Sequence, residues 1–209
     1  HRISLSDWQF MLRNADNHTL PSPITDTAIT SDDIAAIIYT SGTTGSPKGA
    51  AITHGNFLHS ITAYQQTLNL TSKDSTILPI PICHITGLSA LLCLFIHIGG
   101  TIHLHQRFNA DEILKAISQY EITFLHGSPT VFILLTQEAE KHLTEYHYSS
   151  LRMIACGAGH LNIGIINKLS ELFPNTEIRP IYGLTETTSP ASIFPLDARE
   201  SNKVGSSGL

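Results

Sequence analysis

The chain has 209 residues, of which 42% are hydrophobic and 14% are charged, and its formal net charge is −5. This composition is typical of a globular protein with enough apolar residues for a sizeable core. The acidic balance, without a run of Lys and Arg, argues against non-specific nucleic-acid binding. The most apolar stretch, residues 85–98, is shorter than the about 20 residues of a membrane span, so it predicts a buried core helix.

The cysteines and histidines do not form a conventional metal-binding pattern. Cys83, Cys93 and Cys156 are odd in number and widely spaced, which indicates reduced thiols and a cytoplasmic protein. The twelve histidines include no HExxH spacing and no paired CxxC stands beside them, so structural or surface histidines are favoured over a metal centre. The opening residues also lack the pattern of a signal peptide.

A polar segment with turn signals, residues 1–32, is expected to be a loosely structured lead-in. From Asp33 onward, short β-branched runs alternate with segments of helical length. The runs predict strands at 34–40, 75–80, 101–105, 122–126, 151–155 and 176–181. The intervening segments predict helices near 54–68, 86–97, 110–119, 129–142 and 162–172. This alternation is typical of an α/β fold with a mostly parallel sheet and flanking helices.

Two helix starts are marked by their residue types. Asn109 stands three residues before Glu112, a spacing typical of a capping residue and the first helical turn. Pro129 follows Ser128, and proline is favoured in the first turn because its missing N–H needs no partner there.

Polar loops rich in Gly, His, Ser or Thr follow five of the expected strands. These loops are YTSGTTGSPKG at 39–49, PIPICHITG at 79–87, HGSP at 126–129, CGAGHL at 156–161 and YGLTET at 182–187. In parallel sheets ligands bind at the carboxyl ends of the strands, where loops lead into helices. We therefore expect the five loops to converge on one cleft.

The first of these loops has the chemistry of a phosphate site. Small residues let backbone N–H groups approach a phosphate closely, and Ser and Thr hydroxyls and Lys48 add donors and a cation. The spacing matches neither GxxxxGK[ST] nor GxGxxG. From the residues alone, a phosphate loop and a flexible linker both remain open.

The order S-G-T-T-G-x-P-K-G makes YTSGTTGSPKG similar to the signature of the adenylate-forming, or AMP-binding, superfamily. That superfamily includes acyl- and aryl-CoA ligases, luciferases and peptide-synthetase adenylation domains. Further motifs resemble those of the superfamily in the expected order: PICHITG at 81–87, CGAGHL at 156–161, YGLTET at 182–187 and KVGSSG at 203–208. The resemblance implies that residues 33–209 are a central part of the large adenylation domain, with the C-terminal domain absent.

The resemblance implies a two-step reaction. A carboxylate attacks the α-phosphate of ATP to give an acyl adenylate and pyrophosphate, and the thiol of coenzyme A then displaces AMP. ATP, Mg²⁺, coenzyme A and a small-molecule carboxylate are thus the expected cofactors and substrates. The first step requires neutralisation of the triphosphate charge more than a protein nucleophile.

Roles of the phosphate-binding residues follow from their positions in the motifs. The resemblance implies that the β- and γ-phosphates are held by the loop residues Thr40, Ser41, Gly42, Thr43, Thr44, Gly45 and Lys48. Thr185 contacts the α-phosphate, and Glu186 holds Mg²⁺, a cation that prefers oxygen ligands. A helix cap and an exposed acid are the plain alternatives for Thr185 and Glu186.

The remaining implied roles concern adenine and the acyl group. Tyr182 stacks on the adenine and Gly183 lets the nucleotide lie close, while the wall beside adenine and acyl group is formed by Gly157, Ala158 and Gly159. His84 lies beside the carboxylate and the thiol channel. Tyr182 as a core residue and His84 as a structural histidine are the alternatives, and no role is assigned to His126.

Three residues depart from the common pattern of the superfamily, and two of them bear on the acyl substrate. Ile85 occupies the position where amino-acid adenylation domains usually have Asp, so an acyl- or aryl-CoA ligase is favoured over a peptide-synthetase domain. Ile181 stands where small residues are common, and its branched side chain is expected to narrow the acyl channel, which predicts a short or medium acyl group. His160 stands where Pro is common. A non-catalytic nucleotide-binding module is a further alternative.

Two expectations concern the chain as a piece of a larger domain. It is expected to be inactive or barely active alone, because the implied reaction also needs residues that lie elsewhere in the family. Its open sheet edges predict pairing between chains, as in a homodimer.

Overall fold

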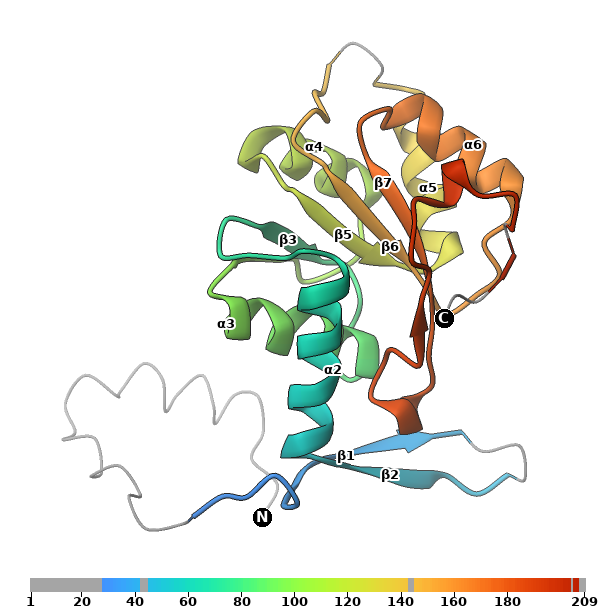
Figure 1. Cartoon of the computed structure of the whole chain (residues 1–209). Coiled ribbons are helices and arrows are strands. Elements are labelled where there is room, and N and C mark those ends of the chain that lie inside the picture. Colours follow the sequence, from blue (N-terminus) through green and yellow to red (C-terminus); the bar gives the residue numbers. More distant parts are fainter. Residues whose placement is uncertain (1–27, 42–44, 143–144, 204, 207–209) are drawn as a thin grey trace, which may run out of the picture.

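The computed structural model describes residues 28–41, 45–142, 145–203 and 205–206 and contains two sheets (Figure 1). The small sheet is a hairpin of β1 (Ile34–Thr40) and β2 (Lys48–Thr53). The large sheet consists of β3 (Ser75–Leu78), β4 (Thr101–Leu104), β5 (Phe124–Gly127), β6 (Met153–Cys156), β7 (Glu177–Tyr182) and β8 (Ser192–Ile193). The helices are α2 (His54–Thr67), the π-helix η2 (Thr86–Cys93), α3 (Leu94–Ile98), α4 (Ala110–Tyr120), α5 (Pro129–Ala139), α6 (Ile163–Leu172) and the short 3₁₀ helices η3 (Thr185–Thr187) and η4 (Ala198–Glu200).

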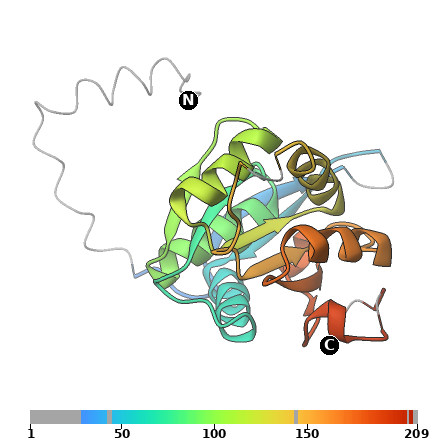
Figure 2. The same ribbon diagram turned by 90° about the horizontal axis from the view of Figure 1, so that it is seen from above.

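The large sheet has the strand order β4-β3-β5-β6-β7-β8, and only the β7–β8 pair is antiparallel. The expected mostly parallel sheet is therefore confirmed. In Figures 1 and 2, α2 and α3 lie on one side of this sheet, and α4, α5 and α6 lie on the other. Helices on both faces are what a parallel sheet requires, because its strands must be buried on both sides.

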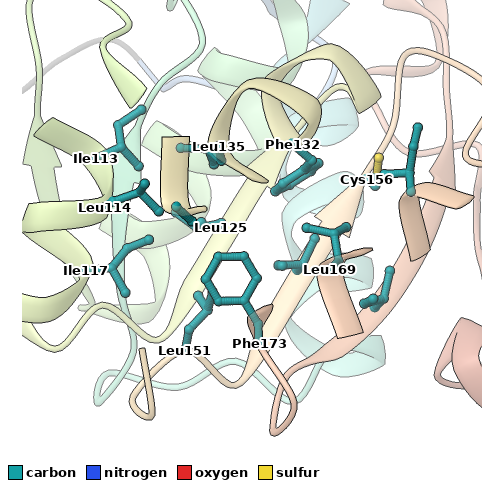
Figure 3. Packing of buried hydrophobic residues seen from close by; sticks show 14 of the residues in the cluster. Ile113, Leu114, Ile117, Leu125, Phe132, Leu135, Leu151, Cys156, Leu169 and Phe173 are labelled. Carbon is teal, nitrogen blue, oxygen red and sulfur yellow. The ribbon is translucent and has the colours of Figure 1, made fainter. Parts of the chain in front are cut away.

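Alternating side chains of the strands supply two hydrophobic cores. Phe124 and Met153 point toward α2 and α3, whereas Leu125 and Ile154 point toward the other helix group. This alternation follows from the two-residue period of a strand. Figure 3 shows the core on the side of α4, α5 and α6, in which Phe132 of α5 and Leu169 of α6 pack against the sheet.

The helix starts follow local capping chemistry. The Asn109 side chain accepts a hydrogen bond from the backbone N–H of Glu112, as predicted. Ser128 accepts from the N–H of Val131, with Pro129 in the first turn. The apolar stretch expected to be a core helix forms η2 and α3, which are largely buried. Within the described residues, no helix is both long enough and apolar enough to cross a membrane.

One predicted strand lies in a different sheet from the one expected. Residues 34–40 form β1, which pairs antiparallel with β2 and takes no part in the parallel sheet. We did not predict β2, because its sequence KGAAIT is short and rich in small residues that carry little strand signal. The glycine-rich loop therefore closes a hairpin and does not lead into a helix.

An ion pair between the buried Asp74 and the partly exposed Arg152 links the start of β3 to the start of β6. The Asp74 carboxylate is almost fully buried and accepts hydrogen bonds from Arg152 Nε and Nη2, both at 2.8 Å. It also accepts from the Thr71 backbone N–H at 2.8 Å and the Thr123 hydroxyl at 2.8 Å. Burial alone would raise the pKa of Asp74, but these donors together hold it below its usual value.

We expect the substitution Arg152→Met to destabilise the fold by on the order of 3 kcal/mol, because it leaves the Asp74 carboxylate buried without its cation. Urea unfolding followed by circular dichroism would measure the loss. Arg107→Met, at an exposed arginine outside the ion pairs of the described residues, is the matched control and should change stability little. Equal stability of the two variants would show that the ion pair contributes nothing.

Candidate functional site

A cavity of about 660 Å³ lies at the carboxyl ends of the parallel strands. Each of the five polar loops contributes to its wall, and the hairpin supplies Lys48. The other four loops supply His84 after β3, His126 at the end of β5, Gly157 after β6 and Thr185 after β7. The expected convergence of the loops is thus confirmed, although the hairpin reaches the cavity from outside the parallel sheet.

The residues named from the sequence divide between two adjoining cavities. The first cavity is lined by Thr40, Ser41, Lys48, His84, Gly157, Ala158, Gly183, Thr185 and Glu186. Gly159 and Tyr182 line a neighbouring cavity of about 500 Å³, which shares Ala158 and Gly183 with the first. Gly42, Thr43 and Thr44 lie outside the described residues. Gly45 is described and has a φ of +92°, a conformation that favours glycine, but it lines neither cavity.

Lys48 is placed by the hairpin register. It pairs with Thr40 across the ladder, and the Thr40 hydroxyl donates to the Lys48 carbonyl oxygen at 3.4 Å. The side chain is exposed, and it forms no ion pair with any described part of the chain. Its ammonium group is therefore available for an anion in the cavity.

His84 is held by a tight turn after β3. Its Nδ1 atom accepts a hydrogen bond from the backbone N–H of Thr86 at 3.2 Å, so the proton of the neutral ring lies on Nε2. The turn needs a glycine at position 87, because a Cβ there would collide with the carbonyl oxygen of Pro81. The sequence PICHITG thus presents an N–H donor at the cavity.

Thr185 and Glu186 lie on the short helix η3, which packs against β2 of the hairpin (Figure 1). The capping contact belongs to the Thr187 hydroxyl, which accepts from the Leu184 N–H at 3.0 Å. The side chains of Thr185 and Glu186 form no hydrogen bond or ion pair with the described residues and line the cavity. The helix-cap alternative for Thr185 is therefore wrong, and Glu186 offers an exposed carboxylate.

Tyr182 is also not the core residue of the alternative interpretation. Its side chain is 47% exposed, whereas the preceding Ile181 is buried and lines both cavities. Successive residues of β7 point to opposite sides, which places the ring on the surface beside Gly183.

A buried polar network that we did not predict connects α2 and η2 to the residues that directly follow η3. The Ser60 hydroxyl of α2 lies 3.0 Å from the Ser89 hydroxyl of η2 and bonds to the carbonyl oxygens of Thr188 and Ser189. One turn along α2, the Tyr64 hydroxyl lies 3.1 Å from the Ser189 hydroxyl. The partners are 29 to 129 residues apart in the sequence, so no local pattern indicated them.

The network ends on His126, whose Nε2 atom lies 3.1 Å from the Tyr64 hydroxyl. The other ring nitrogen, Nδ1, is buried and has no partner among the described residues. Burial, with a smaller contribution from the nearby His84, lowers the pKa of His126 to about 3. The imidazole is therefore neutral in the folded protein at any physiological pH.

We expect the substitution His126→Phe to flatten the dependence of stability on pH. Below its usual pKa of about 6.5 the unfolded chain protonates this histidine, but the folded chain does so only near pH 3. Stability therefore falls as the pH is lowered between these values, by at most about 1.4 kcal/mol per pH unit for one proton. Urea unfolding from about pH 7 to about pH 4 would measure the slope.

His142→Phe is the control for this prediction. Glu145 at 2.7 Å raises the pKa of His142, so that this residue contributes stability at low pH that is lost as the pH rises through its folded-state value. His142→Phe should therefore make stability fall more steeply as the pH is lowered, which is the opposite of the effect of His126→Phe. Parallel behaviour of the two variants would contradict the assignment of His126.

The fold is that of the adenylate-forming enzymes. The structure of O-succinylbenzoate coenzyme A synthetase from Bacillus subtilis, in complex with ATP and magnesium ion, matches 86% of this chain and 36% of that chain, with a TM-score of 0.75 and 32% identity. The family model described as AMP-binding enzyme matches residues 3–209, and the chain belongs to this family. The match begins well before Asp33, where the motif resemblance was expected to start.

Curated relatives are CoA ligases. The chain is 32% identical over 182 residues to 4-coumarate–CoA ligase-like 2 of Arabidopsis thaliana, covering 87% of this chain and 32% of that protein. It is 35% identical over 179 residues to 2-succinylbenzoate–CoA ligase of Bacillus subtilis (strain 168), covering 85% of this chain and 35% of that protein. The chain thus spans about a third of the length of these relatives.

Proposed function

We propose that the protein containing this chain activates a carboxylic acid as an acyl adenylate with ATP and Mg²⁺ and then transfers the acyl group to coenzyme A. The observation that carries this proposal is the convergence of Lys48, Thr185 and Glu186 on one cavity, where neither of the two charged side chains has an ion pair with a described residue. The relatives named above are CoA ligases, and the solved structure named above holds ATP and magnesium.

In the first step the Lys48 ammonium would offset part of the triphosphate charge, and the hydroxyl groups of the cavity would donate hydrogen bonds to the phosphates. The Lys48 ammonium and the hydroxyls of Thr40 and Ser41 line the cavity and would contact the β- and γ-phosphates, and Thr185 would contact the α-phosphate. Glu186 fits a magnesium ion, because an exposed, unpaired carboxylate is the type of oxygen ligand that Mg²⁺ prefers. Bound magnesium supplies charge neutralisation to the phosphates.

Adenine is assigned to the strand ends of β6 and β7. Tyr182 offers an exposed ring for stacking, and Gly183 and the segment 157–159 form the wall between the two cavities. The Nε2–H group of His84 is suited to donate to the substrate carboxylate. In the second step of the proposal the CoA thiol enters along the same side and attacks the acyl carbonyl carbon, so that the thioester forms, AMP leaves and the thiol proton is released.

The substrate is proposed to be a short or medium acyl or aryl acid. Buried Ile85 offers no charge to an α-ammonium group, which disfavours amino-acid adenylation. Buried Ile181 narrows the cavity beside Gly157. The names of the relatives, which refer to 4-coumarate and 2-succinylbenzoate, favour an aromatic acid within this size range.

Several features of the wider protein stay predictions. Residues 33–209 are proposed to form part of a larger adenylation domain, and a cytoplasmic location is proposed from the reduced cysteines. A homodimer is proposed through the open edge of the large sheet, where β4 exposes Leu104.

We expect Lys48→Ala and Glu186→Gln each to lower carboxylate-dependent ATP–pyrophosphate exchange by the full-length protein by about 10²–10³-fold, because each removes charge stabilisation of the phosphates. Lys168→Ala is the matched control, since this surface lysine pairs with Glu140 and lines neither of the two cavities, so the variant should keep its exchange rate. Exchange that survives both substitutions would refute the assigned roles. Exchange with amino acids but not with acyl or aryl acids would favour the peptide-synthetase alternative.

The length of the acyl substrate should also control turnover. We expect a higher kcat/KM for short and medium acids than for long-chain fatty acids, because Ile181 closes the space beside the strand ends. Ile181→Ala should shift the optimum toward longer acids, and a thermal melt of the variant would verify its fold. A preference of the unsubstituted protein for long chains would contradict the narrowing by Ile181.

A further inference from the structure

The turn that follows η3 has a backbone conformation that its residue types disfavour. Thr188 has a φ of +62° and Ser189 has a φ of +44°, so both lie in the left-handed region. That region favours glycine, and a β-branched residue such as Thr188 is an outlier there. Both residues are also buried. A conformation of this kind persists only where surrounding contacts hold it, and such conformations cluster at functional sites.

The turn is continuous with the part of the cavity wall that we assign to the α-phosphate and magnesium. The Thr188 backbone N–H donates to the Thr185 carbonyl oxygen at 3.1 Å, and Ser189 itself lines the first cavity. The turn also lies against Gly183, where a Cβ would come within 3.3 Å of the Ser189 Cα atom. The places of Thr185 and Glu186 therefore depend on the conformation of the turn.

The contacts that hold the turn come from α2. The Ser60 hydroxyl bonds to the Thr188 carbonyl oxygen at 3.0 Å and also to the Ser189 carbonyl oxygen. The Tyr64 hydroxyl, one turn further along the helix, lies 3.1 Å from the Ser189 hydroxyl. Both side chains are buried, where a hydrogen bond is stronger than in water. Two side chains of one helix thus contact both residues of the left-handed turn.

The hydrogen of the Ser60 hydroxyl is committed to the turn. A hydroxyl has one hydrogen to donate, and the two carbonyl oxygens can only accept. The contact with the Ser89 hydroxyl at 3.0 Å is therefore assigned the opposite direction, with Ser89 as the donor. Replacement of Ser60 by alanine would leave both carbonyl oxygens without this donor.

On the basis of the proposed function, we propose that Ser60 and Tyr64 are positioning residues for the binding of magnesium and the phosphates. They hold the left-handed turn so that Thr185 and Glu186 keep their places in the cavity. Neither Ser60 nor Tyr64 lines the first cavity, so both act through the turn and not on the substrate. Both residues lie outside the sequence motifs.

The Mg²⁺ dependence of ATP–pyrophosphate exchange by the full-length protein tests this role. Ser60→Ala should raise the Mg²⁺ concentration that gives the half-maximal rate by about tenfold and lower kcat by about tenfold, because the turn relaxes and Glu186 shifts. The KM for the acid should change little. Thr136→Val is the matched control, because it removes a buried hydroxyl that bonds to the Ile133 carbonyl oxygen within α5 and should leave the Mg²⁺ dependence unchanged.

A change in the backbone of the turn distinguishes positioning from a general loss of stability. Thr188→Gly lets residue 188 adopt its positive φ without strain, so the turn depends less on Ser60. In the Thr188→Gly background, Ser60→Ala should therefore shift the half-saturating Mg²⁺ concentration by less than about threefold. A merely structural role of Ser60 would give the same loss in both backgrounds.

Calorimetric titration with ATP, with and without Mg²⁺, separates this inference from the proposed function. Ser60→Ala should weaken the binding of magnesium-bound ATP by about tenfold and that of metal-free ATP much less. Exchange with no acid at all would overturn the proposed function, while this difference in binding would still support the positioning role. Failure of the unsubstituted protein to bind magnesium-bound ATP would overturn both.

Three outcomes would overturn the positioning role by itself. They are an unchanged Mg²⁺ dependence in Ser60→Ala, an equal loss with and without Thr188→Gly, and an equal shift in Thr136→Val. Should Ser60→Ala fail to fold, Tyr64→Phe takes its place, because it removes only the hydroxyl that contacts the turn and should shift the Mg²⁺ dependence in the same direction.

Discussion

The hydroxyl group of Tyr64 connects the parts of the molecule on which the site depends. It lies in α2 and bonds to His126 of β5 and to Ser189, which follows η3. Buried polar groups must find partners inside the fold, so these contacts restrict how the helix, the sheet and the loop after β7 can be arranged. Because α2 begins directly after β2, the same contacts relate the hairpin with Lys48 to the turn with Glu186.

The parallel sheet explains why distant motifs meet. Parallel strands joined through helices place all their carboxyl ends on one edge, and the loops after β3, β5, β6 and β7 therefore gather there. The hairpin does not obey this rule and reaches the cavity because β2 contacts η3 and α2. Two different structural principles thus combine to enclose the same space.

Most of the fold and part of the site could be predicted from local patterns. Runs of β-branched residues and the caps at Asn109 and Ser128 locate strands and helices, since those signals act within a few residues. The strand β2 was missed because small residues carry little strand preference. The role of Tyr182 could not be decided locally, because a strand residue faces either a core or solvent according to its neighbours.

The sequence by itself determined the α/β class, the alternation of the main strands with helices, and the motifs with Lys48, His84, Thr185 and Glu186, because these depend on residue type and short spacing. Only the tertiary structure decided that β1 belongs to a hairpin, that the Thr187 hydroxyl makes the capping hydrogen bond of η3, and that His126 ends a buried network with one ring nitrogen unpartnered among the described residues. Those features depend on contacts between residues far apart in the chain. Such contacts depend on how the two hydrophobic cores pack around the sheet.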